Sequence, residues 1–396
     1  MSTPQIVLAP RRAKPFYARH PWVFPGAIAE IKGAPVDGAA VQVFSHGGSF
    51  IAHGLFNSKS RLRVRLYSWD LEQALDEGFF RRRLELAISL RRDVLRRMGP
   101  GQACRLVFSE GDGLSGLTVD YYDRWLVLQF TSLAVAQRRD LIVRLLQEIV
   151  NPVGIYLRTE RGIGIQEGVE LHDGPVMGSL PDGPLEIDEN GVKFLVNLAE
   201  GQKTGFYLDQ RDNHLSVAKY ALGRRVLDAF CYSGGFGLHA ARAGAREVIG
   251  VDGSEQAVDL ANQNAQRNGL TQARFERADV FKYLEDAARA RQKFELVILD
   301  PPKFARNQSA IDTALAGYRR LEALSFLLLE PGGLLVTCCC SGVIKPEQFE
   351  DILGQVATEA KRSVQILERH GQPADHPIAL ACPETQYLKC LVTRVL

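Results

Sequence analysis

The feature that most constrains the fold is a repeated alternation in the C-terminal half of the chain. Each unit consists of an apolar run, a loop and a helical stretch. Four such runs are "RRVLDAF", "EVIGVD", "FELVILD" and "GGLLVTCCC". Apolar runs separated by helices are typical of βαβ units, so this half is predicted to form a doubly wound α/β domain around a mostly parallel sheet.

Different patterns precede this α/β half. The first 69 residues contain short β-rich segments with Gly- and Pro-bearing turns, which predict a small β-barrel. A helical pattern then runs to Gly99-Pro100-Gly101, a helix stop, and is followed by strands and an amphipathic helix. The predicted domains are 1–69 (small β-barrel), 70–184 (middle α+β) and 185–396 (a hairpin with its turn at Glu189-Asn190-Gly191, then the α/β domain).

Composition narrows the class of protein. Of the 396 residues of the chain, 46% are hydrophobic and 24% are charged. This composition predicts a globular protein rather than a disordered one. It contains no run of about 18 uncharged apolar residues, so no membrane association is expected. The apolar patch at the N-terminus is too short and too early for a secretory signal, and cytoplasmic residence is the default expectation.

The N-terminal region is unusually basic. Residues 1–69 hold nine Lys or Arg against two acidic residues, a net charge of +7, whereas the whole chain carries +2. Such an asymmetry is compatible with binding a polyanion and equally with a solvated basic face. Lys14 and Arg19 are the candidates for contact with such a polyanion.

Candidate ligand-binding residues follow the apolar runs, because ligands of doubly wound sheets bind at the carboxyl ends of the strands. Asp228 leads into a glycine-rich turn containing Tyr232 and Gly234. An acid at Asp252 could accept hydrogen bonds from both ribose hydroxyls of a nucleoside cofactor. Asp279 is placed to meet an adenine amino group. A nicotinamide dinucleotide is disfavoured, because "YSGGFG" lacks the Gly-x-Gly-x-x-Gly pattern.

Several motifs together resemble a known family. The glycine turn, the acid-terminated strand and Asp300-Pro-Pro-Lys-Phe304 resemble class I S-adenosylmethionine-dependent methyltransferases. Over essentially the full chain, "RHPWVFPGAI", "GQKTGFYLDQRDNH", "DPPKF" and the cysteine run resemble the bacterial 23S ribosomal RNA cytosine-5 methyltransferase family. The resemblance implies a PUA domain, a middle α+β domain and a Rossmann-like methyltransferase domain. It also implies S-adenosyl-L-methionine as cofactor and 23S ribosomal RNA or a large-subunit precursor as partner. The oligomeric state stays open, a homodimer included.

The resemblance also suggests individual residues. The segment "GQKTGFYLDQRDNH" closes over the cofactor in related enzymes, and Phe206 and Gln210 are its expected contacts. Lys303 could contact phosphate or be solvated. Tyr387 and Lys389 are expected on a terminal strand. The expected cofactor-binding residues are Phe206, Gln210, Asp228, Tyr232, Gly234, Asp252 and Asp279.

Three of the seven cysteines stand side by side at 338–340. Metal ligation is disfavoured, because no Cys-x-x-Cys spacing occurs and adjacent strand residues point to opposite faces. Disulfides are disfavoured in a reducing compartment. Methylation of carbon 5 of cytosine instead needs a thiolate that adds at carbon 6. In the family the last cysteine position is regularly filled, so the resemblance assigns Cys340 as nucleophile and Asp300 as the group that supports the base. Cys339 departs from the family's serine, and all three cysteines could instead be small core residues.

Two other functions remain open from the sequence. An amino-group methyltransferase acting on RNA or protein would also use a proline-rich loop after Asp300, but it would not need Cys340. A non-catalytic RNA-binding assembly factor would bind the cofactor without turnover.

Overall fold

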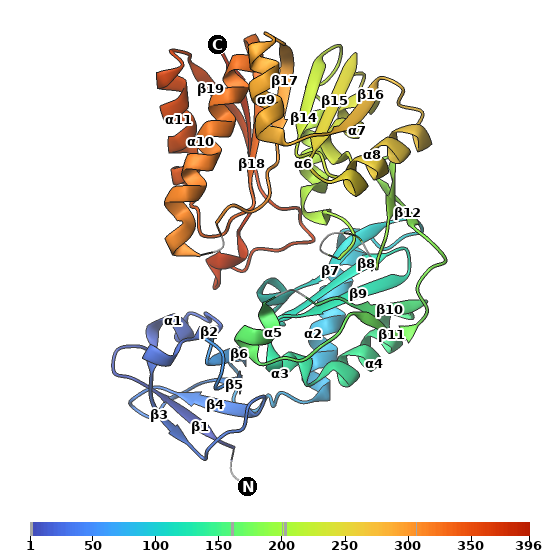
Figure 1. Cartoon of the computed structure of the whole chain (residues 1–396). Helices are drawn as coiled ribbons and strands as arrows, with labels where there is room; N and C mark the ends of the chain where they lie inside the picture. Colours follow the sequence, from blue (N-terminus) through green and yellow to red (C-terminus); the bar gives the residue numbers. More distant parts are fainter. Residues whose placement is uncertain (1–2, 160–161, 200, 202–203, 306) are drawn as a thin grey trace. The chain divides into compact units, whose positions relative to one another are not determined.

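The computed structural model describes residues 3–159, 162–199, 201, 204–305 and 307–396 (Figure 1). The chain divides into two compact units. The first comprises Met1–Ile187, Val196–Leu208 and Ala374–Thr385, and the second comprises Asp188–Leu195, Asp209–Pro373 and Gln386–Leu396. Within the described ranges, no helix is long and apolar enough to cross a bilayer.

The first unit begins with a six-stranded sheet of order β2-β6-β5-β4-β1-β3. Alternating side chains of β1 and β4 are buried, as expected for strands with one face on a core. Ile6, Val43 and Val64 are among the side chains that fill this core. The elements are β1 (Gln5–Leu8), α1 (Lys14–Tyr17), β2 (Trp22–Val23), β3 (Ile28–Lys32), β4 (Ala40–Phe44), β5 (Phe50–Phe56) and β6 (Val64–Ser68), with a short 3-10 turn at Pro25–Ala27.

A second sheet of the first unit has the order β11-β10-β9-β8-β7. Strands β8 and β9 form a hairpin whose turn residues Asp123 and Arg124 both have positive φ, which suits the twist of a tight hairpin. The elements are α2 (Glu77–Ser89), a single π-type turn (Leu90–Val94), β7 (Ala103–Phe108), a 3-10 turn (Ser109–Asp112), β8 (Leu117–Tyr122), β9 (Trp125–Phe130), α3 (Leu133–Ala136), α4 (Arg139–Val150), β10 (Gly154–Leu157), α5 (Ile163–Glu167) and β11 (Gly174–Gly178).

The second unit is built on a seven-stranded sheet of order β16-β15-β14-β17-β18-β20-β19. Strands β14 to β18 are mutually parallel, and β20 runs antiparallel between β18 and β19. Its helices and strands are α6 (Arg211–Ala218), β14 (Arg225–Ala229), α7 (Gly235–Arg242), β15 (Glu247–Asp252), α8 (Glu255–Arg267), β16 (Ala273–Arg277), α9 (Val280–Arg289), β17 (Phe294–Leu299), α10 (Ile311–Leu328), β18 (Leu329–Cys339), α11 (Pro346–Glu359), β19 (Val364–His370) and β20 (Lys389–Val395). Short 3-10 turns occur at Leu208–Gln210 and Gln308–Ala310. A further 3-10 turn, Pro383–Thr385, belongs to the first unit.

Helices cover the large sheet in the way that a doubly wound fold requires. Apolar side chains of α9, α10 and α11 pack together with those of β14, β15, β17 and β18 in one core. From β14 the chain first adds β15 and β16 on one side of the sheet and then returns to place β17 on the other side of β14. This change of direction creates a topological switch point at the carboxyl ends of β14 and β17. The predicted doubly wound, mostly parallel sheet is confirmed, and so is the predicted hairpin, formed by β12 (Leu185–Glu189) and β13 (Val192–Val196).

Candidate active site

The loop between β14 and α7 is shaped for close approach of a ligand. Gly234 has φ +90°, and Phe230 and Tyr232 also have positive φ. A Cβ on Gly237 would lie 2.9 Å from Asp228 Oδ2, so only glycine lets the helix start this close to the strand. The Gly237 N–H donates to Asp228 Oδ2 at 2.8 Å.

The other oxygen of Asp228 is the unusual atom of this loop. Asp228 is 1% exposed, and its Oδ1 has no hydrogen-bond partner in the described structure. Burial raises the pKa of Asp228 to about 7, although the Gly237 N–H opposes the shift. A buried carboxylate oxygen without a partner costs free energy, so this atom is suited to a cationic or hydrogen-bonding ligand group.

Asp252 is the last residue of β15, and its carboxylate accepts hydrogen bonds from the loop after β14 and from the loop after β15. Its Oδ2 accepts from the Tyr232 N–H at 3.0 Å, and its Oδ1 accepts from the Ser254 N–H at 2.9 Å. The side chain is half-buried. Because each carboxylate oxygen has two lone pairs, these bonds leave acceptor capacity for a ligand.

Asp279 follows β16 and is the N-cap of α9. Its Oδ1 accepts from the Lys282 N–H at 2.9 Å, and the residue is exposed. The helix-capping role is therefore present in the structure, and the predicted contact with adenine stays a prediction.

Asp300 follows β17 and receives a hydrogen bond from Gln210. The Gln210 Nε2 donates to Asp300 Oδ1 at 2.9 Å, while Gln210 Oε1 accepts from Asn213 Nδ2 at 2.5 Å. Gln210 is buried. Both polar atoms of this side chain are therefore used in orienting the Asp300 carboxylate, a role that the sequence did not suggest.

The three adjacent cysteines differ sharply in access. Cys338 and Cys339 are buried within β18, whereas Cys340 lies just beyond the strand and is half-buried. Burial, with the neighbouring Cys390 thiol, raises the pKa of Cys338 well above its ordinary value. Cys340 is thus the one of the chain's seven cysteines that is not buried.

Cys340 and the Asp300-Pro301 turn are neighbours because β17 and β18 pair in parallel. The Cys340 Sγ lies 3.9 Å from the Pro301 carbonyl oxygen. The next residue, Ser341, donates its hydroxyl to the Ala305 carbonyl at 2.6 Å. The structure therefore brings together the two residues predicted to be catalytic.

Four predicted site residues either belong to the first unit or are exposed to solvent. Phe206 belongs to the first unit, where its N–H donates to the Tyr122 hydroxyl at 3.2 Å. Lys14 and Arg19 are exposed residues of the first unit, and Lys303 is exposed in the second. Gln202 and Lys203, in the segment expected to close over the cofactor, lie outside the described residues.

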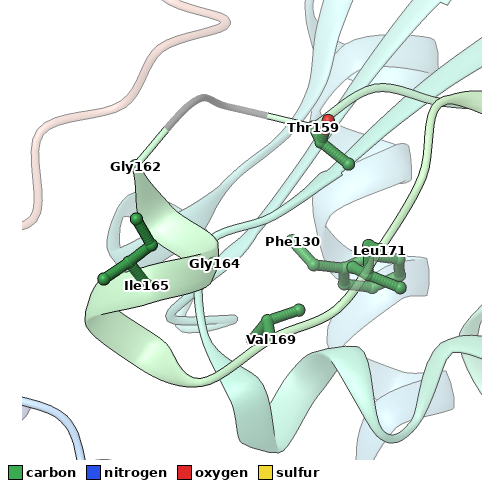
Figure 2. Close-up of a pocket in the computed structure, with 7 residues that line it drawn as sticks. All are labelled: Phe130, Thr159, Gly162, Gly164, Ile165, Val169 and Leu171. Atoms are coloured by element: carbon green, nitrogen blue, oxygen red, sulfur yellow. The ribbon is translucent and has the colours of Figure 1, made fainter.

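A separate hollow of about 180 Å³ occurs in the first unit (Figure 2). It contains none of the predicted site residues. The described residues that line it include no carboxylate, imidazole or thiol: Phe130, Thr159, Gly162, Gly164, Ile165, Val169 and Leu171.

Among the residues that the structure describes, two groups of side chains have the residue types of metal ligands. One is Glu189, His214 and His239 in the second unit, and the other is His20, Cys382 and Glu384 in the first. Their hydrogen bonds are unfavourable for a metal. Both ring nitrogens of His239 face backbone carbonyls, of Gly235 at 2.8 Å and of Glu189 at 3.0 Å. In the other group, His20 Nδ1 accepts a hydrogen bond from the Trp22 N–H at 3.3 Å. In a neutral imidazole the proton is then on Nε2, which faces Glu384, so neither nitrogen offers a metal a lone pair.

The sheet order and the carboxylates at the strand ends define the class of protein. A parallel sheet with an antiparallel penultimate strand, a glycine turn after the central strand and an acid ending the next strand form the fold of class I S-adenosylmethionine-dependent methyltransferases.

Comparisons with known proteins agree with this class. A family model described as S-adenosylmethionine-dependent methyltransferase matches residues 176–394, and one described as PUA-like domain matches residues 6–69. The protein "Ribosomal RNA large subunit methyltransferase I" of Aeromonas hydrophila is 43% identical over 392 residues, 98% of each chain. The protein of the same name from Klebsiella pneumoniae is 40% identical over 99% of this chain and 98% of its own.

Solved structures share the fold. A crystal structure described as that of a methyltransferase complexed with SAH has a TM-score of 0.86 and 22% identity, over 98% of this chain and 99% of that one. A Streptococcus mutans structure, described as an S-adenosylmethionine-dependent methyltransferase, has a TM-score of 0.85 and 21% identity at the same coverage. The chain belongs to the family of S-adenosylmethionine-dependent methyltransferases that includes the ribosomal RNA large subunit methyltransferase I proteins. The family inferred from the motifs is confirmed.

The residues at the strand ends fit the cofactor of this family. S-adenosylmethionine carries an ammonium group, which could satisfy the unpartnered Oδ1 of Asp228. It also carries ribose hydroxyls, for which Asp252 retains acceptor capacity.

Proposed function

We propose that this chain transfers a methyl group from S-adenosylmethionine to carbon 5 of a cytosine in 23S ribosomal RNA, through a covalent adduct with Cys340. The single observation that supports it most strongly is the half-buried Cys340 thiol beside the Asp300-Pro301 turn, in a chain whose other cysteines are buried. The ribosomal RNA substrate is proposed from the names of the relatives. Such a substrate would place the protein in the cytoplasm.

The cofactor would be held at the carboxyl ends of β14 and β15. In this proposal Asp228 binds the ammonium group, the backbone around Tyr232 and Gly234 approaches the cofactor closely, and Asp252 binds the ribose. Asp279 would meet the adenine amino group with the oxygen that does not cap α9. Phe206 and Gln210 remain proposed contacts, and Gln210 would act through its hydrogen bond to Asp300.

Replacing Asp252 by alanine is expected to weaken S-adenosylmethionine binding about ten- to a hundredfold, because a charge-assisted hydrogen bond contributes roughly 1.5–3 kcal/mol. Isothermal calorimetry on the folded variant measures this directly. Asp259→Ala, which removes an exposed acid from α8, is the matched control and should bind normally. Unchanged affinity in Asp252→Ala would exclude Asp252 from the cofactor site.

Cys340 would act as a nucleophile because carbon 5 of cytosine is itself a poor one. Its thiolate adds to carbon 6, so a C6–S bond forms while the C5–C6 double bond opens and N3 takes up a proton. The cofactor, when bound, supplies an electrophilic methyl group, which carbon 5 accepts. A base then removes the carbon-5 proton, the C5–C6 double bond re-forms as the C6–S bond breaks to release the thiolate, and N3 returns the proton that it took up.

Asp300 would act on the opposite edge of the base. Its carboxyl group can accept a hydrogen bond from the exocyclic amine and support protonation at N3 as the thiolate adds. Gln210 holds one oxygen of this carboxyl group in place. Orientation before the reaction is what makes such electrostatic stabilisation effective.

The basic N-terminal region is proposed to bind RNA, within the domain division 1–69, 70–184 and 185–396. Lys14 and Arg19 are exposed and available for phosphate. Arg65 is not, because it is buried and pairs with Glu110 and Glu167 at 3.3 Å each. Lys303, exposed beside Asp300, is proposed to contact phosphate near the target base.

The proposal predicts loss of one 5-methylcytosine from 23S ribosomal RNA when the gene is deleted. Bisulfite sequencing and mass spectrometry of RNA from cells with and without the gene would locate it. The unchanged gene should restore the modification, and a Cys340→Ala gene should not. A lost methyl group on an exocyclic amine, restored by the Cys340→Ala gene, would instead establish amino-group methylation.

A further inference from the structure

Lys389 is a buried lysine beside the cysteines. It is the first residue of β20, the strand that inserts antiparallel between β18 and β19, and it pairs with Cys339 in the sheet register. The residue is 7% exposed. A buried ammonium group is costly unless it is hydrogen-bonded, so its surroundings need an explanation.

The ammonium group of Lys389 donates to three backbone carbonyls. These are Ser341 O at 2.6 Å, Ile344 O at 2.9 Å and Tyr387 O at 2.9 Å. Only the charged form has three N–H donors, so this geometry indicates a protonated lysine. Two of the acceptors belong to the loop that begins immediately after Cys340, and Lys389 therefore holds that loop in place.

The groups near the ammonium group of Lys389 that can ionise to an anion are the thiols of Cys339 and Cys340. Within the described part of the chain, the hydrogen bonds of Lys389 go to carbonyls, and no carboxylate is among the groups that act on its charge. Burial lowers the pKa of Lys389, and the Cys339 and Cys340 thiols act in the opposite direction. A cation that lacks a counter-ion in a partly dry site favours the ionised form of a neighbouring acid.

The other titratable groups around Cys340 do not supply this charge. Tyr318 of α10 is buried, and burial raises its pKa well above the ordinary value, so it stays neutral. Lys303 is exposed, and its field is screened by solvent. Asp300 is acidic and would oppose ionisation of a nearby thiol, which leaves Lys389 as the buried positive charge that offsets it.

We propose that Lys389 is a positioning residue for Cys340, which fixes the loop after the nucleophile and favours the thiolate form of Cys340 by its buried charge. The catalytic meaning of this inference rests on the proposed function, because a thiolate is needed only if Cys340 adds to the base. The effect on the thiol itself is independent of any substrate.

The test is the pH dependence of Cys340 alkylation in the full chain, without RNA or cofactor. Iodoacetamide reacts with the thiolate, and Cys340 is the one cysteine that is not buried, so peptide mapping gives its rate directly. Rates would be measured from about pH 5 to about pH 10, a range that spans the ordinary thiol pKa. The variants are Lys389→Gln, which keeps a donor without charge, Lys389→Arg, which keeps the charge, and Lys389→Met.

Loss of the charge should raise the pH at which Cys340 becomes reactive by about one unit, which makes alkylation near pH 7 about tenfold slower while the rate at high pH is unchanged. Lys389→Gln and Lys389→Met should both show this shift, and Lys389→Arg should stay near the unchanged protein. Lys282→Met, on the exposed face of α9, is the matched control and should show no shift. If Lys389→Met does not fold, Lys389→Gln alone decides.

The inference would be overturned if the folded Lys389→Gln protein showed the same pH dependence of Cys340 alkylation as the unchanged protein. If that variant were also less stable to heat, Lys389 would have a purely structural role. Trapping with 23S RNA that contains 5-fluorocytosine separates this from the proposed function. An adduct in the unchanged protein together with an unshifted Lys389→Gln profile refutes the role of Lys389 only. A shifted profile without any adduct refutes the covalent function and leaves the Lys389–Cys340 coupling intact.

Discussion

Cys340→Ala is expected to lower methyl transfer by roughly a thousandfold or more, because removal of a covalent nucleophile leaves only binding and orientation. The same variant should form no adduct with RNA that contains 5-fluorocytosine at the target. In the unchanged protein the adduct should require S-adenosylmethionine and survive denaturing electrophoresis. Fluorine at carbon 5 cannot leave as a proton, so after methylation the C6–S bond stays. Single-turnover kinetics and peptide mapping of the adduct measure both effects.

The neighbouring cysteines provide matched controls for Cys340. Cys338→Ala and Cys339→Ser change side chains that are buried in β18 and should leave the rate of folded enzyme within a few-fold. An adduct that maps to Cys338 or Cys339 would keep the covalent mechanism and move the nucleophile. Full activity in all three variants would remove the covalent mechanism and favour amino-group methylation.

Asp300→Ala is expected to have the second largest effect, a loss of about a hundred- to a thousandfold in the rate of the chemical step, as for other groups that stabilise developing charge. Cofactor affinity should change little, because Asp300 is assigned to the base rather than to S-adenosylmethionine. Rapid-quench measurements of the single-turnover rate, with calorimetry of cofactor binding, separate these two quantities.

Asp300→Asn sharpens this experiment. The amide oxygen can still accept from Gln210 Nε2, so the local hydrogen bond is kept while the ionisable carboxyl group is lost. We expect this variant to be nearly as slow as Asp300→Ala. Gln210→Ala, which removes the orienting bond to Asp300 together with the bond from Asn213 but keeps the carboxyl group, should cost less than either. An Asp300→Asn enzyme with the unchanged rate would show that the carboxyl group plays no part in protonation at N3.

Local pattern is enough to predict much of the methyltransferase half. The βαβ alternation places acidic residues at the ends of adjacent strands. Asp228, Asp252, Asp279 and Asp300 are found within two residues of the ends of β14, β15, β16 and β17. This works because strand and helix periods are local properties and parallel strands share one carboxyl edge. The family could likewise be inferred from short motifs, and the comparisons confirm it.

The environments of the same side chains were decided only by the tertiary structure. Cys340 is distinguished from its two neighbours because β18 ends at Cys339 and leaves only the last thiol outside the sheet. Gln210 meets Asp300 across 90 residues of sequence, and Lys389 reaches the Ser341 carbonyl across 48 because β20 inserts beside β18. The segment Ala374–Thr385 packs with the first unit although it lies near the C-terminus. Such contacts depend on how distant segments pack and on which polar atoms remain buried, and no local period of the sequence encodes either.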